Sequence, residues 1–229
     1  MESRKVDPAE FLASVRYDRP RSALLVVDVQ PDFLPGGALP VEHGDEVLDP
    51  IRRLMNRDLF PLYVATQDWH PRGHASFASS HPGRRPFDTI TLHGHEQTLW
   101  PGHCVQGTPG AQLYPELPWE RVSAIIRKGT ESDVDSYSGF RNNWNAAGAR
   151  PPTGLAGYLR ERGVRDVIIC GLTRDFCVKW SAEDAVADGF RTIVLWDLTR
   201  PVDPRSNSRV RSDLEAAGVA IVTAERRAV

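Results

Sequence analysis

A cysteine at the junction of two predicted elements is the first residue that could do chemistry. Cys177 lies in residues 171–178, with the sequence GLTRDFCV, between an apolar run at 166–170 and an amphipathic helix over 178–189. We expect Asp175 to cap this helix, so that Cys177 falls in the first turn, where free N–H groups and the helix dipole favour a thiolate. The position predicts a nucleophile at the carboxyl end of a strand, although many cysteines are simply small buried hydrophobes.

Charged side chains at the ends of other predicted strands could serve such a nucleophile. Asp28 ends the apolar run 23–27, and Lys128 follows the run 122–126. A partly desolvated carboxylate can act as a general base, and an ammonium beside a cysteine stabilises a thiolate and an oxyanion. The alternatives are a turn-capping aspartate and a lysine at the protein surface.

Residues of the kinds that bind metals form a second candidate cluster. Asp68 and His70 follow the predicted strand 62–66 and stand two residues apart, so their side chains point to the same side of an extended chain. His103 is a candidate third ligand from a distant loop. One aspartate and two histidines suit zinc, iron or manganese.

Predicted strands alternate with predicted helices along most of the chain. This order indicates a three-layer α/β/α fold on a mainly parallel six-stranded sheet, with residues 1–22 as an N-terminal arm, including a short helix near 7–15, and 23–229 as a single domain. Residues 71–118, rich in Gly, Pro, His and Ser, should be irregular. The predicted strands are 23–27, 62–66, 122–126, 166–170, 192–196 and 219–223, and the predicted helices are 45–57, 153–162, 178–189 and 206–217.

This fold would bring the candidate residues together. In such sheets a ligand binds beyond the carboxyl ends of the strands, at the point where the strand order reverses. Every candidate strand residue lies at or just past a carboxyl end, and these are Asp28, Asp68, His70, Lys128 and Cys177. The sequence therefore predicts one shared site.

The composition indicates which kinds of partner the protein is expected to bind. Of the 229 residues, 41% are hydrophobic and 25% charged, and a net charge of −2 gives no footprint for nucleic acid or a membrane surface. The three cysteines have no paired spacing, and the first twenty residues contain no apolar signal core. We expect a cytoplasmic protein with a small-molecule partner, no nucleic-acid or membrane partner, and a homo-oligomer as an open alternative to the monomer.

Five stretches occur in an order that is specific to one family. They are VDVQPDF at 27–33, TQDWH at 66–70, WPGHCVQGTPGA at 100–111, KG at 128–129 with DSYSGF at 135–140, and DFCVK at 175–179. From about residue 22 to 223 the chain resembles the nicotinamidase branch of the isochorismatase-like cysteine hydrolases. The resemblance implies an amidase that hydrolyses nicotinamide to nicotinate and ammonia in NAD salvage, with pyrazinamide as a further substrate.

The same resemblance implies a catalytic role for three residues. Asp28 would be the general base, Lys128 would hold the charged pair, and Cys177 would form a thioester with the substrate. Backbone N–H groups near Thr173 and Cys177 would bind the oxyanion, beside a cis peptide bond between Leu172 and Thr173. These roles agree with the chemistry that the residue types suggest.

The resemblance further implies a metal and an aromatic pocket. One divalent ion, zinc or alternatively iron or manganese, would bind to Asp68, His70 and His103 and orient the pyridine ring; His74 is a further possible ligand. The residues that match substrate-binding positions are Phe33, Trp100, Tyr137 and Thr173.

One departure from the family pattern concerns the stretch before the nucleophile. Members of this branch commonly have Ala-Thr where this chain has Thr173 and Arg174, so Arg174 could point to solvent, or alter the pocket or the electrostatics of the thiolate. Three rival functions remain open at this point. They are a cysteine hydrolase of the same fold acting on another small amide or ureide, a vinyl-ether hydrolase acting on isochorismate, and a non-catalytic binding protein.

Overall fold

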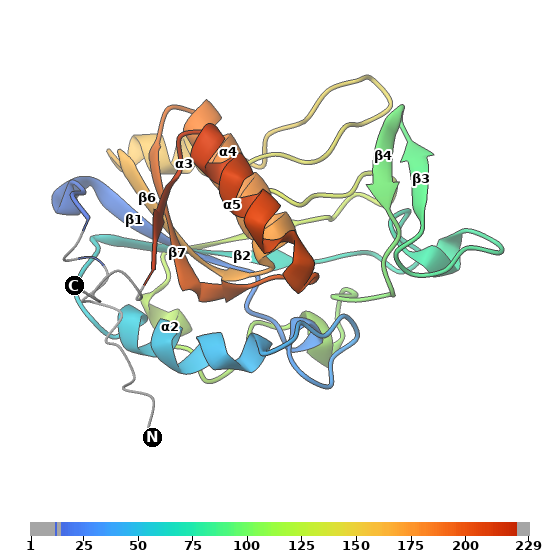
Figure 1. Cartoon of the computed structure of the whole chain (residues 1–229), viewed down its shortest axis with the longest axis horizontal. Coiled ribbons are helices and arrows are strands. Elements are labelled where there is room, and N and C mark those ends of the chain that lie inside the picture. Colours follow the sequence, from blue (N-terminus) through green and yellow to red (C-terminus); the bar gives the residue numbers. More distant parts are fainter. Residues whose placement is uncertain (1–11, 13–14, 224–229) are drawn as a thin grey trace.

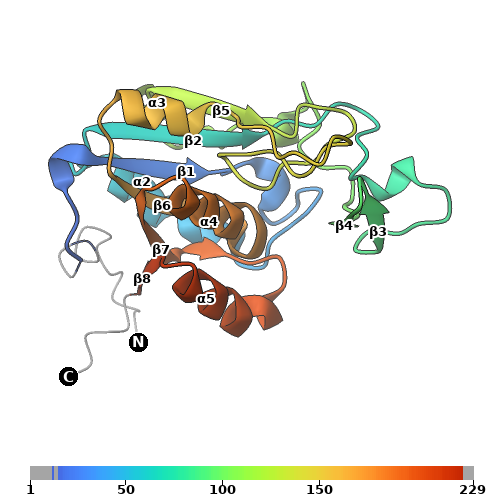
Figure 2. The same cartoon turned by 90° about the horizontal axis from the view of Figure 1, so that it is seen from above.

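The computed structural model describes residue 12 and residues 15–223. Their centre is a sheet of six parallel strands, as the sequence predicts, and the strand order is β5-β2-β1-β6-β7-β8 (Figures 1 and 2). None of the helices in this described part is long and apolar enough to cross a membrane. The strands are β1 Ser22–Val27, β2 Leu62–Asp68, β5 Ala124–Lys128, β6 Asp166–Leu172, β7 Arg191–Arg200 and β8 Ala220–Val222.

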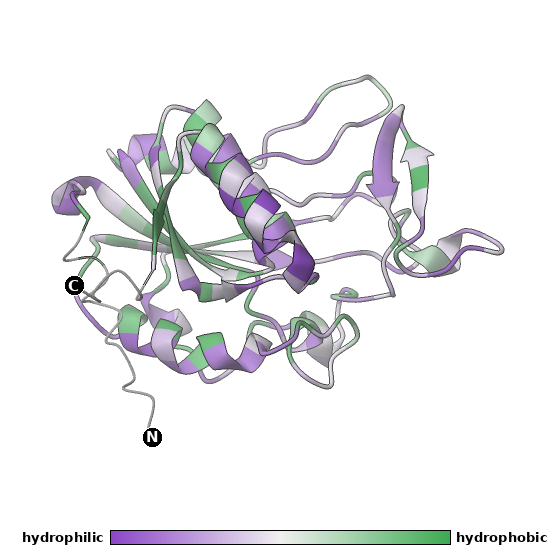
Figure 3. Ribbon diagram, viewed as in Figure 1, coloured by the Kyte–Doolittle hydropathy of each residue, from purple (hydrophilic) through white to green (hydrophobic). Residues whose placement is uncertain are grey.

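Helices cover both faces of the sheet and give it three layers. Helix α2 (Leu48–Met55) packs on one face, and α3 (Leu155–Glu161), α4 (Lys179–Ala187) and α5 (Asn207–Ala216) pack on the other (Figures 1 and 2). Alternate residues of each central strand enter the two cores, so that Leu24 packs towards α2 while its neighbours face the other helices. Burial on both faces explains the continuous apolar runs of the strands, which are the most hydrophobic part of the ribbon in Figure 3.

The strand order reverses between β1 and β6. The chain passes from β1 outward to β2 and β5, then returns to the centre and continues outward through β7 and β8. Val27 pairs with Gly171, and a Cβ at residue 171 would lie 2.0 Å from the Val27 carbonyl oxygen, so only glycine fits there. This close pairing places Asp28, just past β1, beside the segment that follows β6.

Two predictions about segments need correction. The region 71–118 is not wholly irregular, because β3 (Thr89–Leu92) and β4 (His95–Thr98) form an antiparallel hairpin. In addition, β1 includes Ser22, which the prediction assigned to the N-terminal arm. The predicted helix near 7–15 lies outside the described residues except at residues 12 and 15.

Candidate active site

Three strand ends bring a carboxylate, an ammonium and a thiol together. Asp28 follows β1, Lys128 is the last residue of β5, and Cys177 lies in the turn after β6. The Lys128 Nζ atom is 2.9 Å from Asp28 Oδ2 and 3.4 Å from Cys177 Sγ. All three side chains are buried, so these interactions act in a medium that screens charge poorly.

The Lys128 ammonium has more acceptors than protons. Besides Asp28 and Cys177, its Nζ atom contacts Asp68 Oδ1 and the Ser136 carbonyl oxygen, each at 2.9 Å. An ammonium has three protons for these four acceptors. The ammonium therefore does not saturate Asp28 Oδ2, which can also accept the proton of the Cys177 thiol.

The environment favours a protonated thiol in the resting site. Burial raises the pKa of Cys177 well above its ordinary value; Lys128 opposes this shift, while the charges of Asp28 and Asp68 add to it. Burial and the two carboxylates therefore act against the predicted thiolate at the helix start, while the Lys128 ammonium favours it. The thiol must lose its proton when it reacts.

Asp28 is well placed to take that proton. Its backbone has a φ of +45°, which is uncommon for an aspartate, and its Oδ1 atom accepts a hydrogen bond of 2.7 Å from the Thr66 hydroxyl. Burial raises the pKa of Asp28, while Lys128 and Thr66 lower it. Thr66 thereby fixes one carboxylate oxygen and leaves the other to Lys128 and Cys177.

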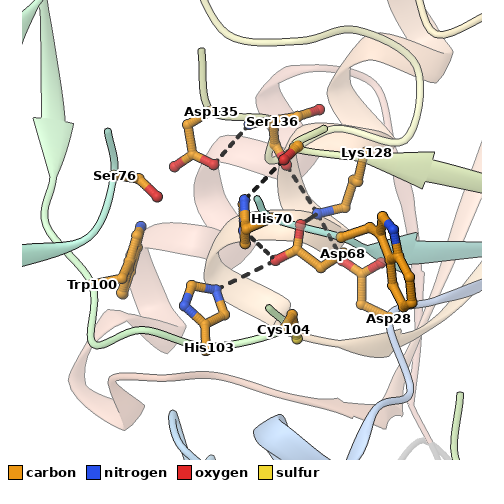
Figure 4. A network of polar contacts seen from close by, with 12 residues as sticks. Asp28, Asp68, His70, Ser76, Trp100, His103, Cys104, Lys128, Asp135 and Ser136 are labelled. Carbon is orange, nitrogen blue, oxygen red and sulfur yellow. Dashed lines mark hydrogen bonds and ion pairs between the residues drawn. The ribbon is translucent and has the colours of Figure 1, made fainter. Parts of the chain in front are cut away.

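Asp68, His70 and His103 form a buried group of possible metal ligands, as predicted. The Asp68 Oδ2 atom is 3.0 Å from His70 Nε2 and 3.4 Å from His103 Nε2 (Figure 4). Each Nδ1 atom faces a carbonyl oxygen instead, that of Gly129 at 3.1 Å and that of Pro101 at 2.9 Å.

These contacts test whether the group suits a cation. A carbonyl oxygen only accepts hydrogen bonds, so both Nδ1 atoms carry protons, and each ring directs its Nε2 atom towards Asp68. Two imidazole nitrogens and a carboxylate oxygen that converge in a buried space form a set of donor atoms that a divalent cation can bind. The residues therefore fit a divalent metal, with the carbonyl groups orienting the imidazoles.

His74 lies next to this group but is not part of it. Its ring packs against His70 with a centroid distance of 4.4 Å, and its Nδ1 atom is 2.8 Å from the Ser76 hydroxyl oxygen. His70, His74 and Asp135 form a separate group of possible ligand atoms. The structure thus separates His74 from the Asp68 and His103 pair.

Backbone and side-chain contacts hold the ligand loops in place. The Gln30 side chain donates to the Asp68 carbonyl oxygen and accepts from the Asp68 N–H, both at 2.8 Å. The carboxylate of Asp32 accepts a hydrogen bond of 2.7 Å from the N–H of Cys104, which follows His103 and has a φ of +45°. Two residues of the first motif therefore support ligands that lie far away in the sequence.

A cavity lies against the thiol and the candidate metal ligands. All four predicted substrate-binding residues line it, with Trp100, Tyr137 and Phe176 in edge-to-face contact with one another. These apolar aromatic walls suit a small flat ring. The lining residues are Phe33, Leu39, Asp68, His70, Trp100, His103, Asp135, Tyr137, Thr173, Phe176, Cys177 and Val202.

The turn that carries Cys177 differs from the predicted helix start. It is a single turn of π-helix, Arg174–Val178, that precedes α4, and the peptide bond between Leu172 and Thr173 is cis, as the resemblance implied. The prediction that Asp175 caps the helix is wrong. Its carboxylate instead accepts hydrogen bonds from the N–H groups of Val202 (2.8 Å) and Asp203 (2.9 Å).

Arg174 neither points to solvent nor enters the pocket, which were two of the alternatives left open by the sequence. It is 5% exposed, does not line the cavity, and directs its guanidinium towards the end of β7. The large charged residue next to the nucleophile therefore leaves the pocket itself unchanged.

Some residues of the site were not predicted. Thr66, Gln30 and Asp135 lie inside the quoted motifs, where their positions were a signal that could have been used. Phe176 is adjacent to Cys177 and could also have been found. Val202 follows β7 in an irregular segment, and no local pattern marks it as a pocket residue.

The comparisons with known proteins agree with this geometry. The family model described as the isochorismatase domain matches residues 22–226. The chain is 48% identical over 181 residues to the nicotinamidase of Acinetobacter baylyi, covering 79% of this chain and 82% of that protein. It is 40% identical over 208 residues to the nicotinamidase of Escherichia coli, covering 89% of this chain and 95% of that protein.

Solved structures give the same result. The Acinetobacter baumanii nicotinamidase/pyrazinamidase superposes with a TM-score of 0.84 at 42% identity, covering 91% of this chain and 98% of that one. The yeast nicotinamidase bound to the inhibitor nicotinaldehyde gives 0.81 at 34% identity (88% and 99% covered). The Pyrococcus horikoshii pyrazinamidase in complex with zinc gives 0.71 at 38% identity (89% and 99% covered). This chain therefore belongs to the isochorismatase family and is similar to its nicotinamidases.

Proposed function

We propose that this protein is a metal-dependent cysteine amidase that hydrolyses nicotinamide to nicotinate and ammonia through a thioester on Cys177. One observation carries the proposal: the Lys128 ammonium lies between Asp28 Oδ2 and Cys177 Sγ, beneath a cavity that suits one small ring. The similarity to curated nicotinamidases supports the choice of nicotinamide as the substrate.

In the first half of the proposed reaction, Asp28 accepts the thiol proton as the Cys177 sulfur forms a bond to the carboxamide carbon. The carbonyl oxygen then bears the negative charge, and backbone N–H groups near Thr173 and Cys177 would bind it. Loss of one such donor typically costs about 2.7–4 kcal/mol in the barrier. Lys128 keeps its positive charge beside the reacting atoms throughout.

The carbon–nitrogen bond breaks when the protonated Asp28 gives its proton to the departing nitrogen, which leaves as ammonia. The acyl group then remains on Cys177 as a thioester. Asp28, again a carboxylate, takes a proton from water while the water oxygen attacks the thioester carbon. The carbon–sulfur bond breaks, the Asp28 proton returns to the sulfur, and nicotinate leaves.

Asp68, His70 and His103 would hold the divalent ion. When bound, this ion would supply a Lewis acid for the pyridine nitrogen and so orient the ring, a positioning role rather than the generation of a nucleophile. Zinc is our first choice, which the zinc-bound pyrazinamidase supports, with iron and manganese as alternatives. The aromatic residues Phe33, Trp100 and Tyr137 would enclose the ring from its sides.

An ammonia-release assay tests the proposal. With nicotinamide as substrate, we expect metal-dependent turnover that a chelator abolishes and that one of the three metals restores. A panel of pyrazinamide, benzamide and a small ureide separates the alternatives. Turnover of the ureide with none of nicotinamide would show that the fold serves a different cysteine hydrolase.

A further inference from the structure

Strand β7 contains an irregularity directly beside the nucleophile turn. Ile169 of β6 pairs with Val194 and Gly171 pairs with Thr199, so that four residues of β7, 195–198, stand opposite Cys170 alone. Residues in such a bulge lose regular ladder partners, and their buried carbonyl groups need other donors.

Residues of β7 supply some of these donors. The Thr199 hydroxyl donates to the Trp196 carbonyl oxygen (2.7 Å). The Arg200 Nη1 atom donates to the carbonyl oxygens of Asp197 (2.9 Å) and Thr199 (2.8 Å).

The Arg174 side chain supplies further donors. Its Nη2 atom donates to the carbonyl oxygens of Trp196 (2.9 Å) and Thr199 (2.6 Å), and its Nε atom donates to the Thr199 hydroxyl oxygen (2.8 Å). Its Nη1 atom donates to Asn207 Oδ1 at 2.7 Å, and the guanidinium lies 4.0 Å from the centre of the Trp196 ring. These four acceptors are neutral, and the planar fork of an arginine matches them in a way that lysine cannot.

The same residue begins the turn that carries Cys177. Thr173, just before Arg174, accepts hydrogen bonds at its carbonyl oxygen from the N–H groups of Phe176 (3.3 Å) and Val178 (2.9 Å). Fixing Arg174 against β7 therefore also fixes the backbone on both sides of it. Asp175 adds a second link, because it accepts hydrogen bonds from the segment that follows β7.

We propose that Arg174 is a positioning residue for the reaction: it ties the nucleophile turn to the bulge of β7 and so sets the direction of the Cys177 sulfur and the neighbouring N–H groups. The inference rests on the proposed amidase function. Arg174 does not line the cavity, so it acts through the turn and not by touching the substrate. It thus deepens the account of the site without changing the substrate.

Kinetics of Arg174→Met provide the first test, since methionine keeps the apolar stem but removes every donor. We expect kcat for nicotinamide to fall about 10- to 100-fold, while KM changes less than about threefold. Arg211→Met is the matched control: its guanidinium lies 4.8 Å from the centre of the same Trp196 ring, but it is 35% exposed and pairs with Glu215 at the surface. The control should keep both constants.

Two ligands separate positioning from simple stabilisation. Nicotinaldehyde traps the thiol, since the Cys177 sulfur adds to the aldehyde carbon and the thiol proton moves to the aldehyde oxygen, whereas nicotinate only occupies the pocket. In Arg174→Met the affinity for nicotinaldehyde should fall by the same factor as kcat, while the affinity for nicotinate stays the same. In Arg174→Ala, millimolar methylguanidinium should restore part of kcat, and methylammonium should not.

The experiments distinguish a failure of the proposed amidase function from a failure of the proposed role of Arg174. If the parent protein does not hydrolyse nicotinamide, the proposed function fails, yet the rate of Cys177 alkylation by iodoacetamide still tests Arg174. A lower Tm with unchanged kcat, aldehyde affinity and alkylation rate would overturn the positioning role. Should Arg174→Met not fold, Arg174→Lys replaces it in the same measurements, because its single ammonium cannot satisfy all four acceptors; full activity in that variant would also overturn the proposal.

Discussion

At the scale of single residues, the site depends on how the three protons of the Lys128 ammonium are divided among four acceptors. The Lys128 ammonium serves Asp28, Asp68, Cys177 and the Ser136 carbonyl group with only three protons. Burial makes each of these contacts strong and any missing contact costly. The proposed acid–base chemistry therefore depends on how the Lys128 protons are divided among these neighbours.

Removal of the thiol should abolish turnover without disturbing this arrangement. In Cys177→Ala we expect a loss of roughly 10⁴-fold or more in kcat, because no other described side chain in the cavity can form the thioester. Tm and metal content should match those of the parent. Cys170→Ala is the control, since that thiol is buried inside β6 and should be dispensable for chemistry. Residual activity with loss of metal would contradict the assignment.

The acid limb of the pH profile should report Asp28. Burial raises the pKa of Asp28, and the Thr66 hydrogen bond lowers it by favouring the charged carboxylate. Thr66→Val removes this bond, so the pKa rises further, and the base becomes available only at higher pH. We expect the acid limb of kcat/KM to move up by about one pH unit. Thr91→Val, at an exposed position of the hairpin, should leave the profile unchanged. A shift to lower pH would contradict the sign.

At the scale of elements, tight turns past the strands decide where the ligands can lie. Gly129 follows β5 with a φ of +63°, and a Cβ there would lie 2.4 Å from the His70 Cε1 atom. The position thus needs glycine for two reasons, the backbone conformation and the close approach of an imidazole. The Lys128-Gly129 motif therefore places both the proposed catalytic lysine and the imidazole of His70, a candidate metal ligand.

A pair of alanine variants separates these two reasons. Gly148 has a φ of +71° with open space around it, so Gly148→Ala should cost only the backbone strain, about 1 kcal/mol. Gly129→Ala adds the clash with His70, and we expect a total of about 2–4 kcal/mol together with weaker metal binding. Urea unfolding and metal titration measure both effects. Equal losses in the two variants would show that the approach of His70 is unimportant.

Comparison of predicted and observed elements shows which signals were sufficient. Continuous apolar runs identified the strands of the parallel sheet, and the motifs pointed to the residues that the structure brings together as candidate metal ligands and candidate catalytic residues. The β3–β4 hairpin was missed because its strands are only four residues long and β4 is polar, although His93 and Gly94 occupy the two positive-φ positions of its turn. Asp175 was misassigned because its partners, such as Val202, come from a segment far along the chain, which no local pattern can supply.

At the scale of the whole molecule, the parallel sheet brings residues from distant segments together at the carboxyl ends of its strands. The strand order reverses between β1 and β6, so Asp28 and Cys177 approach each other from neighbouring strands. Lys128 reaches both from the end of β5, the outermost strand on that side of the sheet. This agrees with the general position of sites in open parallel sheets. The folded core is thus a precondition for every contact in the site.

Metal removal should therefore lower the stability of the whole domain. A ligand that binds only the folded state raises stability, by about 2.7 kcal/mol at a concentration of 100 Kd. We expect reconstitution with zinc to raise Tm of the parent, and His103→Ala to bind less metal, lose most of this rise and show a higher KM for nicotinamide. His43→Ala, at an exposed position, is the control. Equal metal content in His103→Ala and the parent would contradict the ligand assignment.

The two oxygens of Asp68 face different neighbours, and this has a consequence for how the protein can change. Oδ1 binds Lys128, and Oδ2 faces His70 and His103. A cation bound at Oδ2 would draw electron density away from Oδ1 and weaken its ion pair with the ammonium. The proposed catalytic residues and the proposed metal ligands would then be coupled through one carboxylate. Exchanging one metal for another would then change the basicity of Asp28 and Cys177 through Lys128. A mutation that adapts the metal ligands to a new substrate would also alter the proposed catalytic residues.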